Sequence, residues 1–497
     1  MVFDTNDTGL LPNFSKTYDV CIAGAGVAGI TLAKALAEQK KHVLLLEAGG
    51  QAYSRLSQDF YDGDIVGHDY FDLSISRLRY LGGTSNHWGG WCRPLDPWDF
   101  RPRDYVEWSG WPITERDSSP FLSEAIQIME IESVPPETTT FDGAEGNFTE
   151  ITNRFSPPVR FKDKYHKLLE TSPYIDLVLN ANLVDILNAS ENGQVSSFVF
   201  RGYSNDHKRY KAKAKKYVLA LGGIENARML LNINRKSGEW LGHSRELIGR
   251  FFMDHLVYSV GVFIDLQDSL RTGQRFFSPT NSFIKRHQIA NFAIRIAPAA
   301  KRTLTQSARE EMKDVVCSSD VVADFVKQIK PSFDCLPTVS ESTQAGLLRI
   351  ASEQSPNYSS CVRLADERDR FNLHKVALDW RFLPIDRKTI RTASMEFAKL
   401  LARMNLGRAK LFDWVLDDNQ ELPGYKEGYE MAGYHHMGTT RMGTSPKNGV
   451  VDKNSRIFGS NNLYVTGSSV FCTAGHANPT LTITQLALRL AQHLSAT

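Results

Sequence analysis

Two short apolar runs near the start of the chain, residues 18–23 and 43–46, each have the length of a buried strand. Between them, residues 27–39 carry apolar positions at helical spacing. A strand, a helix and a second strand in this order predict a β-α-β unit, in which the two strands lie parallel.

Glycines with a distinctive spacing join these elements. Gly24, Gly26 and Gly29 follow the first run, and Glu47 closes the second. The first glycine permits a tight turn, the second lets the backbone approach a pyrophosphate, and the third lets the helix lie close to the strand. The carboxylate can accept hydrogen bonds from a ribose diol, which disfavours a 2′-phosphate. The segment therefore predicts a dinucleotide site; a glycine-rich turn without a ligand is the weaker interpretation.

A second group of apolar runs lies at residues 183–187, 195–201 and 210–221. Two glycines end the last run, and a helical stretch follows at 224–231. The order predicts another strand-turn-helix of the same domain.

The pattern changes between residues 256 and 429. Alternating runs at 258–264, 291–296 and 375–382 predict antiparallel strands, and residues 385–404 predict an amphipathic helix. A sheet with helices suits a substrate domain. The polar residues 133–150 predict a loop, which is a candidate lid.

The last part of the chain returns to the first pattern, with a strand at 463–467 and a buried helix at 481–494. We therefore expect an α/β fold with a discontinuous Rossmann-like domain and a second α+β domain on a mostly antiparallel sheet. The expected boundaries are 15–110, 177–255 and 430–497 for the first domain, and 111–176 and 256–429 for the second.

Composition excludes several classes of function. The formal net charge is +2 over 497 residues, without a basic stripe, so we expect no nucleic-acid partner. No apolar run approaches a membrane span and the start lacks a secretory signal, which predicts a soluble cytoplasmic protein. The six cysteines show no C-x-x-C spacing, so we expect reduced thiols, no disulfide framework and no metal site.

Several segments together resemble the glucose-methanol-choline (GMC) oxidoreductases, flavoproteins that oxidise alcohols and sugars. They are the N-terminal unit with Leu-Leu-Glu-Ala-Gly at 45–49, the glycine-rich residues 81–90, residues 219–228, and the C-terminal pair 433–439 and 474–480. They span nearly the whole chain in the family's order. The resemblance implies FAD rather than NAD, and it points to the branch of choline oxidase and pyranose oxidase.

The resemblance also implies which residues hold the cofactor. The glycine-rich segment covers the flavin ring, because glycines let the backbone come close to a flat ring. Val184 presents its backbone to the adenine, and Gly467 with Ser468 approaches the ribityl-phosphate. The implied set is Gly24, Gly26, Gly29, Glu47, Gly82, Gly83, Thr84, Ser85, Asn86, His87, Trp88, Val184, Gly467, Ser468, Asn478, Pro479 and Thr480.

His87 stands where some relatives bond a histidine to the flavin 8α-methyl group. Two interpretations stay open: FAD is covalently attached through His87, or the histidine packs unlinked beside the dimethylbenzene edge. Trp88, Trp91 and Trp98 are expected in the core, although they could stack on a sugar.

The C-terminal pair of segments carries the implied catalytic residues, His435 and Asn478. Alcohol oxidation requires removal of a hydroxyl proton and transfer of a hydride from the same carbon to flavin N5. A neutral imidazole can accept the proton, and an amide NH₂ can donate a hydrogen bond to the developing alkoxide. His435 is thus the expected base, and Asn478 the residue that positions the substrate.

Three further histidines have weaker interpretations. His436 faces away from its neighbour in an extended segment and is expected to be structural. His476 is expected to be a loop histidine bonded to backbone, with a pocket-lining role as the alternative. His255 is a candidate contact at the pocket entrance.

The function expected from the resemblance is FAD-dependent oxidation of a CH–OH group of a sugar, polyol or secondary-metabolite alcohol. The expected partners are the alcohol substrate and oxygen or another electron acceptor. Two alternatives remain: a flavin-dependent lyase, cyclase or photoenzyme on the same scaffold, and a non-catalytic FAD-binding electron carrier. A carrier needs neither His435 nor Asn478, which argues against that last alternative.

Overall fold

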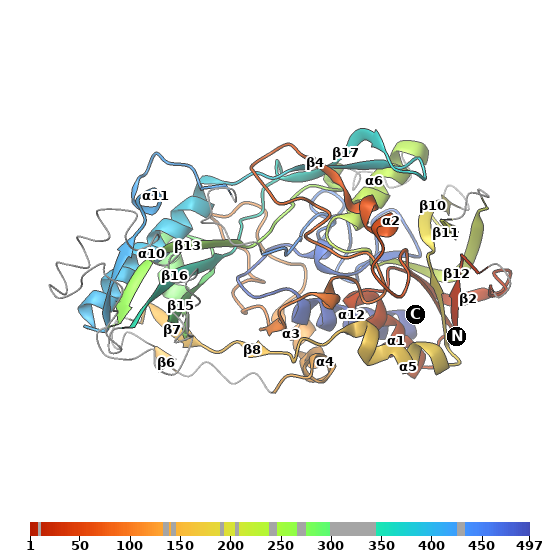
Figure 1. Cartoon of the computed structure of the whole chain (residues 1–497), viewed down its shortest axis with the longest axis horizontal. Coiled ribbons are helices and arrows are strands. Elements are labelled where there is room, and N and C mark those ends of the chain that lie inside the picture. Colours follow the sequence, from red (N-terminus) through yellow and green to blue (C-terminus); the bar gives the residue numbers. More distant parts are fainter. Residues whose placement is uncertain are drawn as a thin grey trace, which may run out of the picture.

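Two sheets at opposite ends of an elongated molecule organise the chain, and both termini lie at the end that holds the first sheet (Figure 1). The structure is a computed structural model. It describes residues 1–7, 11–132, 139–140, 146–188, 193–203, 208–237, 246–265, 275–298, 344–424 and 433–497.

The first sheet has eight strands in the order β1-β9-β3-β2-β12-β11-β10, and β20 also pairs with β12. The strands from β1 to β12 in this order pair in parallel, as does β20, whereas β11 and β10 are antiparallel. The bounds are β1 (Val2–Asp4), β2 (Thr17–Ala23), β3 (Val43–Leu46), β9 (Ile175–Leu179), β10 (Asn182–Asn188), β11 (Val195–Arg201), β12 (Tyr210–Leu219) and β20 (Leu463–Val465).

The helix between the first two long strands confirms the predicted β-α-β unit. It is α1 (Val27–Glu38), and it packs against the C-terminal helix α12 (Thr480–Ala496). A Cβ at Gly29 would lie 1.9 Å from the carbonyl oxygen of Gly24, so only glycine lets the helix approach the turn this closely. The last helix of the chain therefore completes the layer that its first helix begins.

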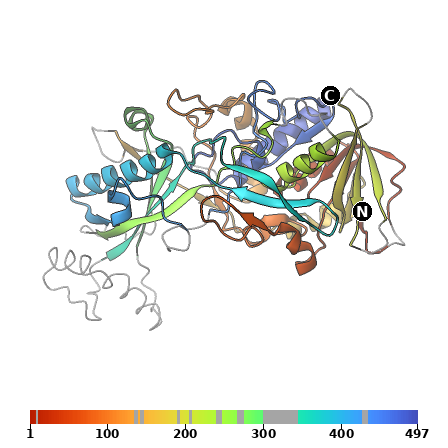
Figure 2. The same cartoon turned by 90° about the horizontal axis from the view of Figure 1, so that it is seen from above.

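The second sheet has seven strands in the order β19-β13-β16-β15-β14-β7-β6, all antiparallel. Helix α10 (Pro384–Arg403) packs on it and is drawn blue at the far end from the termini in Figure 2. The strand bounds are β6 (Thr139–Thr140), β7 (Phe148–Ile151), β13 (Leu256–Asp265), β14 (Arg275–Pro279), β15 (Phe292–Pro298), β16 (Gln344–Ser352) and β19 (Gly407–Leu411).

Smaller elements connect the two sheets. Strands β17 (Cys361–Arg368), β18 (His374–Asp379) and β4 (Gly63–Ile65) form a three-stranded sheet against α6 (Glu225–Ser237), which is longer than the predicted helix. Further short elements are β5 (Trp91–Cys92), β8 (Arg154–Phe155), α2 (Arg55–Gln58), α3 (Glu115–Ser118), α4 (Leu122–Met129), α5 (Phe161–Thr171), α7 (Asn281–His287) and α11 (Asp413–Leu416).

Two segments pack against a different domain from the one to which the expected boundaries assign them. Helices α4 and α5, within residues 111–176, pack on α12 and α1 of the first sheet, whereas only β6 and β7 of that stretch join the second. The hairpin β17–β18, within 256–429, packs on α6. Both arrangements depend on long-range packing that local patterning does not report. The candidate lid lies mostly outside the described residues, as do Cys317 and Cys335.

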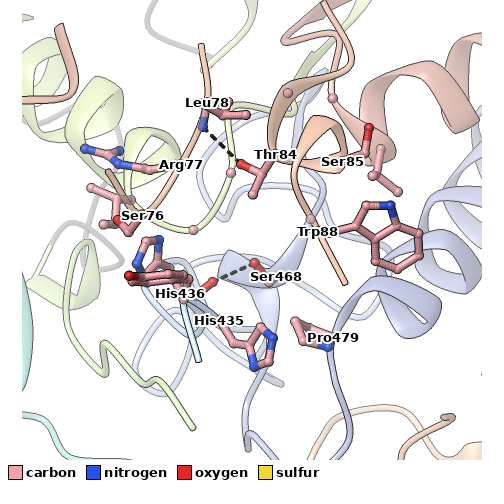
Figure 3. Close-up of a pocket in the computed structure, with 18 of the residues that line it drawn as sticks. Ser76, Arg77, Leu78, Thr84, Ser85, Trp88, His435, His436, Ser468 and Pro479 are labelled. Atoms are coloured by element: carbon pink, nitrogen blue, oxygen red, sulfur yellow. Dashed lines mark hydrogen bonds between the residues drawn. The ribbon is translucent and has the colours of Figure 1, made fainter. Parts of the chain in front are cut away.

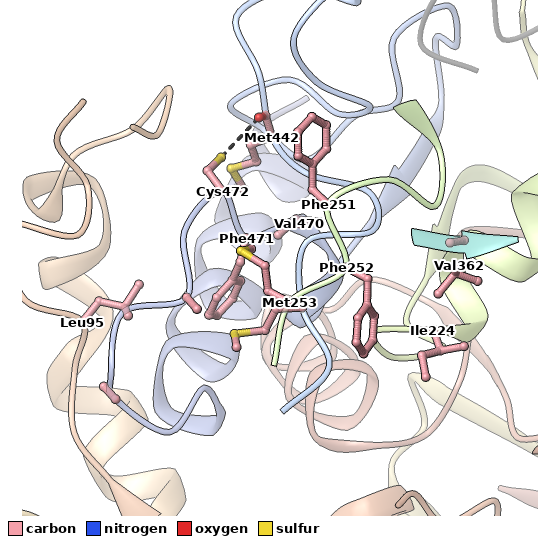
Figure 4. Packing of buried hydrophobic residues seen from close by; sticks show 14 of the residues in the cluster. Leu95, Ile224, Phe251, Phe252, Met253, Val362, Met442, Val470, Phe471 and Cys472 are labelled. Carbon is pink, nitrogen blue, oxygen red and sulfur yellow. Dashed lines mark hydrogen bonds between the residues drawn. The ribbon is translucent and has the colours of Figure 1, made fainter. Parts of the chain in front are cut away.

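A cluster of buried apolar side chains links the segment after α6 to the segment before α12. It includes Phe251, Phe252, Met253, Val470 and Phe471, drawn in Figure 4. This packing fixes the backbone that leads directly into the residues of the site. In the part of the chain that the structure describes, no helix combines the length and hydropathy that a membrane crossing requires.

Candidate active site

A cavity of about 720 Å³ extends from the carboxyl ends of β2, β3 and β12 to one face of the second sheet. The carboxyl edge of a parallel sheet is where open α/β folds bind their ligands. The volume lies within the usual range for small-molecule and cofactor sites. Figure 3 shows part of this cavity, with His435, Pro479 and Trp88 on its wall.

The glycines after β2 leave free space at the cavity wall. Gly24 has φ of +104°, and a Cβ at Gly26 would meet no atom within 4 Å. Both glycines line the cavity, whereas Gly29 is not among the lining residues and serves the helix contact described above. The room beside Gly26, at the start of α1, fits an anionic group held by the helix N-terminus.

Glu47 is held in place by the backbone around it. Its Oε2 accepts from the Ala25 N–H at 3.0 Å and its Oε1 accepts from the Gly49 N–H at 2.8 Å. Burial raises the pKa of this carboxyl, although these hydrogen bonds oppose the shift. Each oxygen has a second lone pair, so the carboxylate can still accept from a ribose hydroxyl.

The glycine-rich segment curls against the first glycine turn. Gly82 and Gly83 have φ of +89° and +55°, and a Cβ at Gly83 would stand 3.2 Å from the Gly26 Cα. Ser85 Oγ donates to the Gly82 carbonyl at 2.7 Å. Gly83, Thr84, Ser85, His87 and Trp88 line the cavity, whereas Gly82 and Asn86 do not.

The side chains of this segment have different surroundings. Thr84 Oγ1 accepts from the Leu78 N–H at 3.3 Å (Figure 3), and Asn86 donates to the Leu81 and Gly83 carbonyls. Trp88 donates to the Val159 carbonyl at 2.9 Å. The His87 imidazole is exposed toward the cavity and makes no hydrogen bond to any described residue. His87 is therefore accessible to a ligand.

The C-terminal segments supply the opposite wall. Gly467 has φ of +106° with nothing within 4 Å of its Cβ position, and Ser468 Oγ donates to the His436 carbonyl at 2.6 Å. Asn478, Pro479 and Thr480 line the cavity where α12 begins. Val184 does not line the cavity; its neighbour Leu183 does.

A backbone bridge brings two histidines together. Met253 and Met437 exchange N–H···O hydrogen bonds of 3.1 and 2.9 Å in antiparallel register, which sets His255 opposite His435. The two Nδ1 atoms are 2.7 Å apart, and His435 Nε2 is 3.1 Å from Asn478 Nδ2. Sequence reasoning placed His255 only at the entrance and missed this contact, because no local pattern joins residues 180 positions apart.

The hydrogen bonds of this chain determine which nitrogens carry protons. His255 Nε2 lies 3.3 Å from the Ala474 carbonyl, which can only accept, so that nitrogen donates. The neutral His255 Nδ1 then accepts, and His435 Nδ1 must donate to it. His435 Nε2 is left as an acceptor, to which the Asn478 NH₂ donates. The unprotonated nitrogen of His435 therefore faces the carboxamide.

A second hydrogen-bonded chain supports the first from behind. Asp254 Oδ1 accepts from the backbone N–H groups of His255 and His435, at 2.7 and 2.8 Å. Tyr70 donates to Asp254 Oδ2 at 2.5 Å and lies 3.0 Å from His436 Nε2. His436 thus faces away from His435, as predicted, and holds the tyrosine. Tyr70 and Asp254 were missed because only the tertiary contacts join them.

Burial keeps these imidazoles neutral. The pKa of His435 is well below its ordinary value, first because burial disfavours the charged ring and then because His255 and His436 lie close. Burial likewise lowers the pKa of His255 to about 4 and that of His436 to about 3. At neutral pH all three rings are unprotonated on one nitrogen.

His476 differs from its predicted environment. Its Nε2 lies 3.2 Å from Asp96 Oδ2 and 3.3 Å from Ser278 Oγ, so its partners are side chains rather than backbone. Its ring also lines the cavity. Among the tryptophans, Trp98 is buried, whereas Trp88 and Trp91 are half-buried at the cavity wall.

The wall formed by the second sheet contains two arginines, Arg295 on β15 and Arg349 on β16. Sequence reasoning did not single them out. The available signal, for Arg295, was a charged residue inside the otherwise apolar run 292–296. In the described parts of the chain, no group of His, Cys, Asp and Glu side chains is arranged to hold a metal.

Comparisons with known proteins agree with this geometry. Residues 356–487 match the family model described as GMC oxidoreductase, and residues 22–73 match an NAD(P)-binding Rossmann-like domain. The chain is 24% identical over 297 residues to 2-methyl-1,2-propanediol dehydrogenase of Mycolicibacterium austroafricanum, covering 58% of this chain and 49% of the relative. It is also 24% identical over 297 residues to the fructose dehydrogenase large subunit of Gluconobacter japonicus, covering 58% and 48%. The chain thus spans about half the length of these curated relatives.

Solved structures share the fold over the whole chain. Pyridoxine 4-oxidase from Mesorbium loti superposes with a TM-score of 0.59 at 16% identity, covering 96% of this chain and 99% of that one. A formate oxidase variant of Aspergillus oryzae RIB40 superposes with a TM-score of 0.54 at 14% identity, covering 98% and 99%. At such identities the likeness concerns the fold alone.

Proposed function

We propose that the chain is a GMC oxidoreductase, an FAD-dependent enzyme that oxidises a CH–OH group of a small molecule to a carbonyl. One observation carries the proposal: an unprotonated imidazole nitrogen, on His435, meets the Asn478 carboxamide at the wall of a cavity whose other end has dinucleotide-binding geometry. The alternative of a non-catalytic carrier leaves this pair without a role.

The residues along the cavity fit FAD. The open space at Gly26 and Gly467 suits groups that must contact backbone closely, and Glu47 can accept from the ribose. Ser468 and the start of α12 would lie beside the phosphate and ring portions. When bound, the flavin supplies the hydride acceptor.

His435 is the proposed base. The substrate hydroxyl donates to His435 Nε2, which takes up its proton as the carbon loses its hydride. His255 keeps that nitrogen unprotonated by accepting from Nδ1, and the Ala474 carbonyl fixes His255 in turn. These contacts orient the base before substrate arrives.

Asn478 is the proposed positioning residue for the substrate oxygen. Its NH₂ group donates to His435 Nε2 in this structure; when the substrate hydroxyl takes that place, the amide is free to donate to the developing alkoxide instead. Proton acceptance and charge stabilisation thus belong to two different side chains. The names of the relatives, which include a diol dehydrogenase and a fructose dehydrogenase, support alcohols and sugars as the general substrate class.

The test of this function is anaerobic reduction of the purified yellow protein by a panel of sugars and alcohols. We expect His435→Ala to slow flavin bleaching by about 100-fold or more while FAD content stays unchanged. His166→Ala, an exposed histidine on α5, serves as the matched control. Unchanged reduction kinetics in His435→Ala contradict the assignment of the base.

We propose further that His87 bonds FAD covalently. The accessibility of its imidazole, which has no hydrogen-bond partner among the described residues, supports this assignment. Burial, and then the nearby Arg160, lowers the pKa of His87, so its ring is neutral and nucleophilic at neutral pH. Acid precipitation tests the bond: yellow colour stays in the pellet of the parent protein and leaves it in His87→Ala. A colourless parent pellet means that FAD is not linked.

A further inference from the structure

Arg295 and Arg349 stand opposite each other on neighbouring strands of the second sheet. The register pairs Arg295 of β15 with Arg349 of β16, and Phe276 of β14 with Arg295. All three side chains line the cavity. Residues directly opposite on one face of an antiparallel pair have Cβ atoms about 5 Å apart, so the two guanidinium groups can reach one ligand.

Neither arginine has a polar partner among the residues that the structure describes. The Nε atoms of both are buried without a hydrogen bond, and neither side chain forms an ion pair with any residue that the structure describes. The guanidinium of Arg295 lies 5.1 Å from the centre of the Trp91 ring, a cation–π contact that supplies neither a hydrogen-bond acceptor nor a counter-charge. Arg275, on the same sheet, is instead paired with Glu150 at 2.8 Å.

Two facing cations without counter-charge are unfavourable. Like charges directly opposite on neighbouring strands destabilise a sheet, and half-buried cations lose hydration. Burial, and then the proximity of Arg349, lowers the pKa of Arg295 to about 10, so both groups still carry their charge at neutral pH. An anion lying between them relieves this repulsion and accepts the unused N–H donors.

The cavity's acidic residues lie elsewhere. Glu225 and Asp369 are bonded to Arg77 and Arg228, and Glu47 to backbone N–H groups. They line the end beside the first sheet, away from β15 and β16. The end of the cavity beside β15 and β16 is therefore positively charged. The described acidic residues that line the cavity lie at its other end and do not neutralise the two arginines.

On the same face of the second sheet, a row of small side chains lies between the arginines and the histidines. Ala293, Ala351 and Val257 form a row of cross-strand neighbours, two residues along the strands from the arginine row. Two residues of strand span roughly 7 Å, and the small side chains of this row leave room for a carbon skeleton. His255 precedes Val257 by two residues, so the arginines lie beyond this row from the proposed base.

We propose that the substrate is an alcohol bearing a carboxylate or phosphate group, which Arg295 and Arg349 bind while the hydroxyl faces His435. This inference rests on the proposed alcohol oxidation and specifies its substrate class. The skeleton between hydroxyl and anion lies over Ala293 and Ala351, flanked by Trp91 and Phe276.

The anion site is tested apart from turnover. Isothermal titration calorimetry of the purified flavoprotein measures the dissociation constants of benzoate and phenyl phosphate, with benzamide as the neutral counterpart. We expect both anions to bind more tightly than benzamide, and Arg295→Gln or Arg349→Gln to weaken anion binding by about 10- to 100-fold. Arg275→Gln, on the other face of the sheet, should leave it unchanged. Anion binding that equals benzamide binding, or that is insensitive to both arginine variants, overturns the proposal.

The reaction provides the second readout. Stopped-flow reduction compares 4-(hydroxymethyl)benzoate with 4-(hydroxymethyl)benzamide in the parent and in both arginine variants. We expect kcat/KM to favour the anion by about 10-fold or more, through KM, and the preference to disappear in the variants. Equal reduction by both alcohols overturns the anion proposal and leaves alcohol oxidation standing. Arginine-dependent benzoate binding without reduction by any alcohol overturns the oxidation instead. Comparing benzoate with phenyl phosphate identifies the preferred anion.

Discussion

At the scale of single residues, the protonation of His435 is set by its protein neighbours. His255 and the Ala474 carbonyl determine which ring nitrogen carries the proton, and Asp254 holds the backbone of both histidines. The imidazole is oriented by its hydrogen bonds with His255 and Asn478, and its backbone by the hydrogen bond to Asp254, so removing one of these neighbours should change the chemistry without removing the proposed base.

Variants at His255 test this orienting role. His255→Ala removes the acceptor for His435 Nδ1, and we expect flavin reduction to slow by about 10- to 100-fold because the base loses its fixed tautomer. His255→Asn presents an amide oxygen in place of Nδ1 and should restore much of the rate. Stopped-flow reduction with the FAD content checked by absorbance measures both. Equal rates in His255→Ala and the parent would show that the contact has no role.

The pH dependence of reduction follows from the lowered pKa of His435. Because the folded-state pKa lies below 6.5, the ring stays unprotonated as the pH falls from 8 to 6.5, and the rate should stay constant over that interval. Burial raises the pKa of Asp254 to about 6, so this carboxyl takes up a proton first on further acidification. We expect the rate of flavin reduction to fall only at or below about pH 6. A fall in rate centred above pH 6.5 would contradict the lowered pKa of His435.

At the scale of elements, Gly26, which immediately precedes α1, and Gly29, in its first turn, have different tasks. A Cβ at Gly29 would overlap the Gly24 carbonyl, whereas a Cβ at Gly26 would enter open cavity. One glycine is required by the fold and the other by the proposed ligand.

Alanine substitutions separate these tasks. We expect Gly29→Ala to lower the yield of folded protein and its melting temperature, because the helix must move away from the turn. Gly26→Ala should fold but bind FAD at least about 10-fold more weakly, because the methyl group occupies space that the pyrophosphate needs. Far-ultraviolet circular dichroism and FAD titration of the apoprotein measure the two effects. Loss of folding in Gly26→Ala alone would reverse the assignment.

The sequence predicted those elements that the local spacing of apolar residues determines. The β-α-β unit, the C-terminal helix and the alternating strands at 258–264 and 291–296 follow from periodicity, and each coincides with an observed element, with residues 39 and 291 just outside it. Contacts between distant segments were not predictable. The His255–His435 pair depends on a backbone bridge, and the arginine pair depends on the register of β15 with β16. The partners of His476 likewise come from loops remote in sequence.

At the scale of the whole molecule, a buried ion pair ties the loop after β5 to the second sheet. Arg103 donates to both carboxylate oxygens of Glu353 at 2.7 and 2.6 Å, and both side chains are 0% exposed. The Asn291 N–H also donates to Glu353. This contact joins the cavity wall of the second sheet to segments near the first.

Breaking this pair should destabilise the protein. Arg103→Met leaves the Glu353 carboxylate buried without its counter-charge, and we expect the free energy of unfolding to fall by about 3–5 kcal/mol. Arg363→Gln removes a half-exposed partner of Asp379 and should cost about 1 kcal/mol or less. Urea denaturation of the holoproteins measures the difference. A similar small effect in both variants would show that the buried pair is not a structural tie.

The order of segments around the cavity has a consequence for biosynthesis. Its walls draw on residues from Ala23 to Ile483, so a ribosome has to release both sheets and the start of α12 before the pocket exists. Cofactor capture thus has to follow the synthesis of α12. A nascent protein that still lacks α12 would already display the glycine turn, yet the pocket around it would be incomplete.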